Sequence, residues 1–164
     1  MAWWAMAFRW LHVLSGIMWI GHLWYFNFVQ TPSMPKIPDE QKPAITKFIA
    51  PTALFWFRWG AMATIVTGLI LAWMNGYLLS AIKLGIRDHN AHNTAIGFGM
   101  WLGTIMWFNV WVLIWPNQKK VLGIVQAQPD EKKRAGRIAG LASRVNTMLS
   151  IPMVYAMVGA GHFY

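Results

Sequence analysis

Long apolar runs alternate along the chain with short segments rich in proline and charged residues. Four of these runs reach about 20 residues or more, the length that an α-helix needs to cross the hydrocarbon core of a bilayer. They cover residues 3–29, 53–79, 92–115 and 143–163. The stretch from Gly97 to Trp115 is almost wholly apolar, whereas each helix of a soluble four-helix bundle carries a broad polar face. The pattern therefore predicts four membrane-spanning helices.

Prolines mark the predicted ends of the helices. Pro32 lacks an amide hydrogen and is expected to end the first helix near Gln30, and Pro51 is expected to reset the chain before the second. An amphipathic segment over residues 117–142 is expected on the cytoplasmic surface. The predicted fold class is all-α, with residues 1–164 forming one domain, an integral membrane four-helix bundle.

Basic residues are distributed unevenly in this chain of formal net charge +9. Only Lys83 and Arg87 lie between the second and third runs, and most of the others lie in the remaining two connections. These two connections contain Lys36, Lys42 and Lys47, and Lys119, Lys120, Lys132, Lys133, Arg134, Arg137 and Arg144. This positive-inside pattern places both connections in the cytoplasm and both termini in the periplasm of a bacterial inner membrane. The excess charge indicates contact with anionic lipid headgroups rather than with nucleic acid.

Cysteine is absent from the sequence. Disulfides, thiolate metal sites, cysteine-ligated iron–sulfur clusters and the attachment of a c-type haem are therefore excluded. The first apolar run is longer than the core of a secretory signal and has no small-residue cleavage site after it, so we interpret it as a retained span.

Histidines are expected to gather in the periplasmic half of the membrane. His12 lies about 13 Å from the periplasmic end of the first helix, and His89, His92 and His162 lie at helix ends on the same side. Imidazoles from facing helices are suitable axial ligands of a b-type haem, which predicts a metal site formed by His12 and His92, with His89 and His162 as alternative ligands and Trp19 as a flat packing surface. The alternative is that the helix-end histidines are ordinary interfacial residues and that His12 is a hydrogen-bonded core residue.

A second polar group is expected in the cytoplasmic half. It contains Arg58, Asn109 and Asn146, with His22 at a similar depth. Ionisable groups inside a membrane are costly and usually face the bundle interior, so these residues are candidates for a catalytic or anion-binding pocket. The alternative is that Arg58, about 8 Å from the end of its helix, extends its guanidinium to the cytoplasmic interface.

Four ordered blocks of residues carry a resemblance to a known family. They are Arg9-Trp10-Leu11-His12 with Gly16, Trp19-Ile20-Gly21 and Tyr25-Phe26; Phe57-Arg58-Trp59-Gly60-Ala61 with Thr67-Gly68; Trp107-Phe108-Asn109-Val110-Trp111 with Ile114-Trp115-Pro116-Asn117-Gln118; and Arg144-x-Asn146-x-x-x-Ser150-x-Pro152-Met153. Together they resemble the membrane domain of the bacterial membrane-bound urate oxidase (urate hydroxylase) family, whose longer members also have a cytochrome c domain.

The resemblance implies an oxidative membrane module linked to cytochrome c. The positions that it carries over are His12, Arg58, Asn109, Trp115, Asn117, Arg144 and Asn146. The chain departs from the longer enzymes in lacking the cytochrome c domain and in having His22 where a small residue is expected.

The leading functional hypothesis is a membrane redox module that binds haem b and passes electrons to a cytochrome c or a larger membrane complex. If the chain is itself an enzyme, the expected activity is that of a urate oxidase-like oxidoreductase. The alternatives are a non-catalytic accessory subunit of a membrane assembly and a small transporter-like protein. Assembly into a homo-oligomer is also left open.

Overall fold

The computed structural model describes residues 2–86 and 89–162, and within these ranges the chain is helical with no β-strand. Arg87 and Phe163 lie outside the described residues. The first half of the chain contains α1 (Ala2–Trp24), η1 (Tyr25–Gln30), α2 (Thr31–Ser33), η2 (Met34–Lys36), α3 (Lys42–Ala44), η3 (Ile45–Ile49) and α4 (Ala50–Met74). The second half contains α5 (Leu78–Ile82), α6 (Ala91–Phe108), η4 (Asn109–Ile114), α7 (Trp115–Val121) and α8 (Pro129–Ala160). The predicted all-α class is confirmed.

Two continuous helical segments are long and apolar enough to cross a membrane. They are Lys42–Met74, which joins α3, η3 and α4, and Ala91–Val121, which joins α6, η4 and α7. These segments contain most of the second and third predicted spans. Helix α8 begins with several charged residues and has a low mean hydropathy, whereas α1 is about as apolar as α4.

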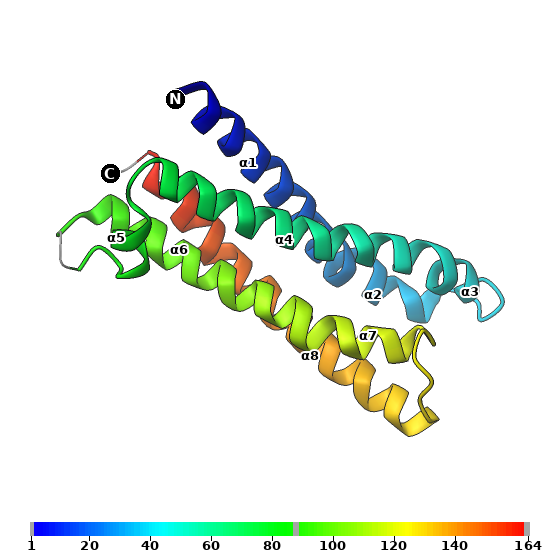
Figure 1. The fold of residues 1–164 in the computed structure, drawn as a ribbon. Coiled ribbons are helices and arrows are strands. Elements are labelled where there is room, and N and C mark those ends of the chain that lie inside the picture. The colour runs from blue at the N-terminus through cyan, green and yellow to red at the C-terminus, as the bar shows by residue number, and fades with distance from the viewer. Residues whose placement is uncertain (1, 87–88, 163–164) are drawn as a thin grey trace.

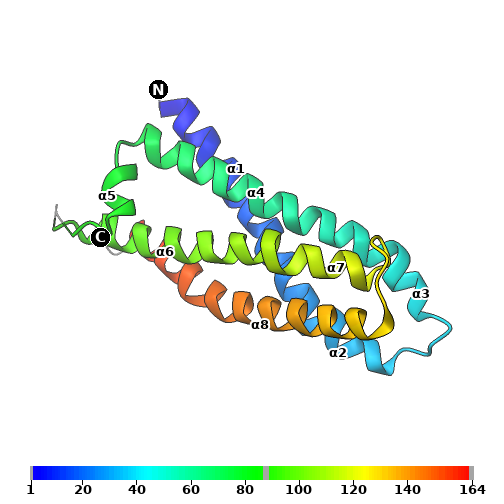
Figure 2. The ribbon, with the colours of Figure 1, turned by 60° about the horizontal axis from the view of Figure 1, so that its bottom comes forward.

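The long helices pack as two pairs. Helix α1 lies against α4, and α6 lies against α8, as both ribbon views show (Figures 1 and 2). The N-terminal end of α1 diverges from α6 and α8 (Figure 1), so that this half of the helix packs mainly on α4.

The apolar core lies at one end of the molecule, where the two pairs meet. Its most deeply buried side chains are Trp19 and Leu23 of α1, Phe57 of α4, Met106 of α6 and Val110 of η4. These residues belong to the second half of α1, the first half of α4 and the second half of the α6–η4 segment. They therefore mark the end of the molecule that the sequence assigns to the cytoplasmic side.

Three π-helical segments each precede a proline. Segments η1, η3 and η4 are followed within two residues by Pro32, Pro51 and Pro116. A proline ring collides with the carbonyl four residues earlier in a regular α-helix, and a wider π turn provides room for it. Helical backbone therefore continues past the predicted end at Gln30 as far as Lys36, and Pro51 lies within a continuous helix.

Two buried glycines of α6 give a test of helix packing. A Cβ at Gly97 would overlap the carbonyl oxygen of Ala81 in α5, whereas a Cβ at Gly103 would have no heavy atom within 4 Å. We expect Gly97→Ala to lower the free energy of unfolding by about 1–3 kcal/mol, because overpacking forces the backbone to shift. Gly103→Ala is the matched control and should be neutral or stabilising by up to about 1 kcal/mol, because alanine is the better helix former.

Thermal unfolding in mild detergent measures both variants. Equal midpoints for Gly97→Ala and Gly103→Ala would show that α5 does not pack against α6 at this point.

Candidate functional site

The side chain of Arg58 lies between α4 and the η4–α7 segment. Its guanidinium carbon lies 3.3 Å from the ring centroid of Trp115 and 6.0 Å from that of Trp111. The ring of Trp111 also meets Trp59 edge to face, with centroids 5.6 Å apart. A guanidinium stacked on an indole is stabilised by the electrostatic attraction of the ring face. The tryptophans thus hold the cation in place without neutralising it.

Several N–H donors of Arg58 and of three tryptophans are buried and have no hydrogen-bond partner within the described residues. They are Nε and Nη1 of Arg58 and Nε1 of Trp111, Trp107 and Trp19. Trp107 and Trp111 are four residues apart and so project from the same side of their helix. An unpaired buried donor costs about 1–3 kcal/mol. Of the six buried side-chain atoms without a partner among the described residues, five are donors and one, Gln30 Oε1, is an acceptor.

No carboxylate of the sequence lies in a predicted span. The five acidic residues are Asp39, Glu40, Asp88, Asp130 and Glu131, all in connections or at the start of α8. The single salt bridge among the described residues joins Lys42 Nζ and Asp39 Oδ1 at 2.6 Å. The hydrogen bond and the charge of Lys42 lower the pKa of the Asp39 carboxyl. Arg58 thus has no counterion from the spans.

Asn109 and Asn146 form an interhelical amide pair. Asn109 Nδ2 donates to Asn146 Oδ1 at 2.8 Å, and Asn146 Nδ2 donates to the backbone carbonyl of Met106 at 2.9 Å. Asn146 is fully buried. These hydrogen bonds join α8 to the junction of α6 and η4, and none of them involves Arg58. The structure therefore pairs two of the three predicted catalytic residues and leaves Arg58 in a separate aromatic setting.

Two further hydrogen bonds connect α8 to the first helical segment. Trp24 Nε1 donates to Ser150 Oγ at 3.0 Å, and Asn27 Nδ2 donates to Ser143 Oγ at 2.7 Å. Sequence reasoning did not single out Trp24 or Asn27. The available signal was their spacing of three residues, which places both on one face of a helix.

His12 and His92 both have their Nδ1 atoms bonded to backbone carbonyls. His12 Nδ1 lies 2.9 Å from the oxygen of Thr64, and His92 Nδ1 lies 2.6 Å from the oxygen of Ala160. A methyl group at Gly68 would lie 2.7 Å from Cε1 of His12, so this glycine makes room for the imidazole. Both rings are half-buried. This arrangement fixes the ring and directs ligand binding to Nε2, as is usual for a metal-binding histidine.

The remaining predicted cofactor residues have different surroundings. His89 is exposed in the connection before α6, with a left-handed φ of 45°. His162 is also exposed, and its Nδ1 is 2.8 Å from the oxygen of Val158. Trp19 is buried in the apolar core, and its backbone nitrogen approaches Gly60 closely. Among the described residues, no cluster of three or more His, Cys, Asp or Glu side chains forms a metal site.

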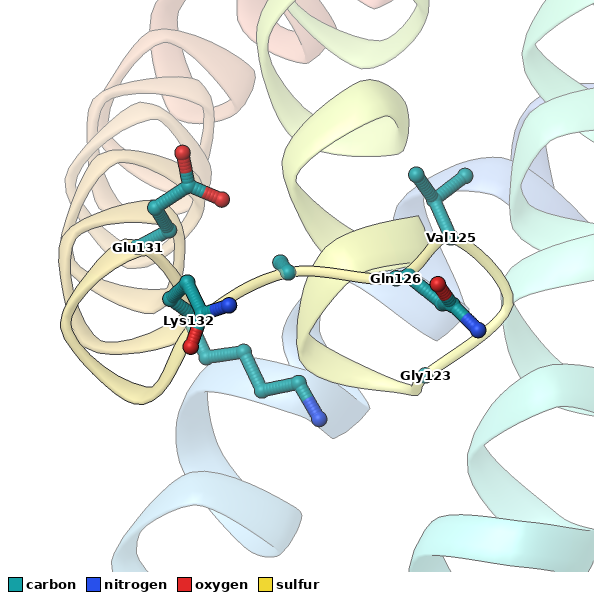
Figure 3. Close-up of a pocket in the computed structure, with 7 residues that line it drawn as sticks. Gly123, Val125, Gln126, Glu131 and Lys132 are labelled. Carbon is teal, nitrogen blue, oxygen red and sulfur yellow. The ribbon is translucent and has the colours of Figure 1, made fainter.

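A pocket of about 420 Å³ lies away from these residues, at the connection between α7 and α8. Figure 3 shows Gly123 and Gln126 in the connection and Glu131 and Lys132 in the first turn of α8, with the Lys132 side chain extending toward the connection and Glu131 pointing away from it. None of the predicted site residues lines it. The pocket has one cation and one carboxylate in its wall, so its electrostatics favour no particular charged ligand.

The amide pair gives a prediction for stability. We expect Asn146→Ala to lower the free energy of unfolding by about 1–3 kcal/mol, because it leaves Asn109 and the Met106 carbonyl without their partner. Asn117→Ala is the matched control, because Asn117 bonds only the carbonyl of Leu113 on its own helix. Thermal unfolding in detergent measures both, and equal losses would contradict an interhelical role for Asn146.

Comparison with known proteins places the chain in a family. A family model described as "Urate oxidase N-terminal" matches residues 80–164, which is just over half of the chain. The matched region contains α6 to α8, with His92 and the Asn109–Asn146 pair, while His12 and Arg58 lie before it. No curated protein and no solved structure matches the chain. The chain belongs to the urate oxidase N-terminal family.

Proposed function

We propose that the protein is an integral membrane redox module whose four long helical segments span a bacterial inner membrane, with both termini in the periplasm. The wide distribution of exposed apolar side chains supports this placement. Trp3 is 88% exposed, Trp73 is 71% exposed and Met148 is 69% exposed, and they lie on three different helices. Surfaces of this kind are stable in lipid and are aggregation-prone in water.

The unpaired donors around Arg58 are the observation that carries the functional proposal. A cation and several buried N–H groups without an acceptor are complementary to a flat anionic ligand with several carbonyl oxygens. The family name points to urate or a related purine as that ligand. The proposed site lies on the cytoplasmic side, near the ends of α4 and η4.

Each residue of the site has a distinct role in this proposal. The Arg58 guanidinium favours the anionic form of the ligand and orients it through parallel hydrogen bonds. The indole N–H groups of Trp107 and Trp111 donate to its carbonyl oxygens. The ring of Trp115 covers the guanidinium and limits the access of water, which strengthens the electrostatic contact. The Asn109–Asn146 pair positions η4, and thereby Trp111, relative to α8.

The histidines fit the donor set of a haem b. His12 and His92 would hold it through Nε2, because each has Nδ1 committed to a backbone carbonyl. His89 and His162 fit less well, since both are exposed at the ends of their helices. When bound, a haem supplies one-electron transfer. The contribution of the chain is to fix both imidazole rings through the carbonyls of Thr64 and Ala160.

A second candidate function is that of an accessory subunit in a larger membrane assembly. It is favoured by the outer half of α1, which packs mainly on α4 and exposes Trp3, Trp4 and Trp10. Such rings are suitable for contact with another chain, including a cytochrome that accepts electrons. Stoichiometric co-purification of a larger complex would support this function.

Ligand-dependent stabilisation tests the Arg58 site. Urate should raise the unfolding temperature of the protein in detergent, and Arg58→Ala should weaken binding about 10- to 100-fold, because it removes a charge-assisted hydrogen bond. Arg9→Ala is the matched control, since Arg9 is an exposed arginine in the other half of the molecule. Trp111→Phe keeps the ring and removes one unpaired donor, so it should weaken binding up to about 10-fold without destabilising the unliganded protein.

No stabilisation of the wild-type protein by millimolar urate or related purines would contradict the assignment of this ligand class. Equal effects of Arg58→Ala and Arg9→Ala would contradict the assignment of the site.

An optical spectrum tests the haem hypothesis. The purified protein should show a Soret band and a reduced-minus-oxidised difference spectrum, and His12→Ala or His92→Ala should remove or shift both, because an axial ligand is lost. His22→Ala is the matched control, since the hydrogen bond of its Nδ1 stays within its own helix, to the Met18 carbonyl. A folded, colourless protein that binds no added haem would refute this part of the proposal.

A further inference from the structure

The first turns of α8 carry several cations with no salt-bridge partner among the described residues. Lys133, Arg134, Arg137 and Arg144 are all exposed. Asp130 and Glu131 are close in sequence but form no salt bridge with them in the described structure. The opposite face of α8 is covered, because Ala135, Ala139 and Ala142 are buried. The cations therefore project away from the rest of the protein.

Apolar side chains share this exposed face of α8. Arg137, Leu141, Arg144 and Met148 follow one another at intervals of four, three and four residues, which aligns them along one side of a helix. Leu141 is 51% exposed, and the apolar row continues through Met148. Arg137 and Arg144 thus lie beside the N-terminal part of an apolar row, and this row continues through Met148 into the last predicted span.

The two arginines span slightly more than the headgroup layer of a bilayer. Arg137 and Arg144 are seven residues apart, which corresponds to about 10.5 Å along the helix. The headgroup layer of one leaflet is about 5–7 Å thick. Arginine side chains extend toward polar surroundings, so Arg144, the deeper of the two, extends outward to the level of the lipid phosphates, and Arg137 lies at the outer edge of the headgroup layer.

We propose that this face of α8 binds an anionic phospholipid of the cytoplasmic leaflet. Arg144 binds the phosphate, Arg137 and Lys133 contribute to the preference for a net negative headgroup, and Leu141 and Met148 pack along the acyl chain. The proposal rests on the membrane placement given above and is independent of the Arg58 and haem sites. An acidic protein partner is less suitable, because it offers no match to an apolar row that continues toward the bilayer centre.

Native mass spectrometry of the detergent-solubilised chain tests this proposal. The wild-type protein should retain phosphatidylglycerol more strongly than phosphatidylcholine, and Arg137→Gln/Arg144→Gln should lower the phosphatidylglycerol affinity roughly 30-fold. Lys36→Gln/Lys47→Gln is the matched control, because it removes the same charge from exposed residues of the other basic connection and should have little effect. Leu141→Ser removes an apolar contact with the acyl chain and leaves the charges unchanged. It should therefore weaken the retention of both lipids.

Equal losses in the two double variants, or no preference of the wild-type protein for phosphatidylglycerol, would overturn the proposal. Loss of an acidic protein partner in Arg137→Gln/Arg144→Gln, with lipid retention unchanged, would also overturn it. Unfolding temperatures in the absence of added lipid confirm that each variant is folded. Failure of the chain to enter nanodiscs would instead refute the membrane placement, so the two failures are distinguishable.

Discussion

A half-buried guanidinium without a carboxylate partner is the physical constraint on which the interpretation of this protein depends. Arg58 cannot lose its charge, and the sequence supplies no acid within the spans to neutralise it. Stacking on Trp115 compensates part of the cost of burial but leaves N–H groups of Arg58, Trp107 and Trp111 without acceptors. An anionic ligand supplies both the charge and the acceptors that the helices lack, which is why the functional proposal centres on this side chain.

The amide pair that joins α8 to α6 and η4 lies at the same end of the molecule as Arg58. The apolar core and the Asn109–Asn146 pair lie where the two helix pairs meet, whereas α1 and α6 diverge toward the other end. The three π-helical segments also belong to the half that the sequence assigns to the cytoplasmic side, each before a proline. Trp111 itself lies within η4, so the wider turn bears on the direction of its side chain.

Several features could be predicted from local sequence alone. The apolar runs of residues 53–79 and 92–115 predicted long helices, because their length and composition fit only a helix in an apolar setting, and α4 and α6 lie within or across them. The end of the first helix was not predictable from Pro32, because whether a proline ends a helix depends on whether the backbone can widen before it. The depth estimate grouped Arg58, Asn109 and Asn146, but depth does not fix rotation about the helix axis, and Arg58 contacts tryptophans instead.

The sequence by itself determined the all-α class, the distribution of charge and the absence of an acid near Arg58, because these follow from composition and from the order of residues. Only the tertiary structure decided which donors remain unpaired, that His12 lies in the space left by Gly68, and that Asn146 joins α8 to α6. Such contacts depend on how neighbouring helices are rotated and shifted against each other. That arrangement results from the packing of many side chains together, which no single stretch of sequence encodes.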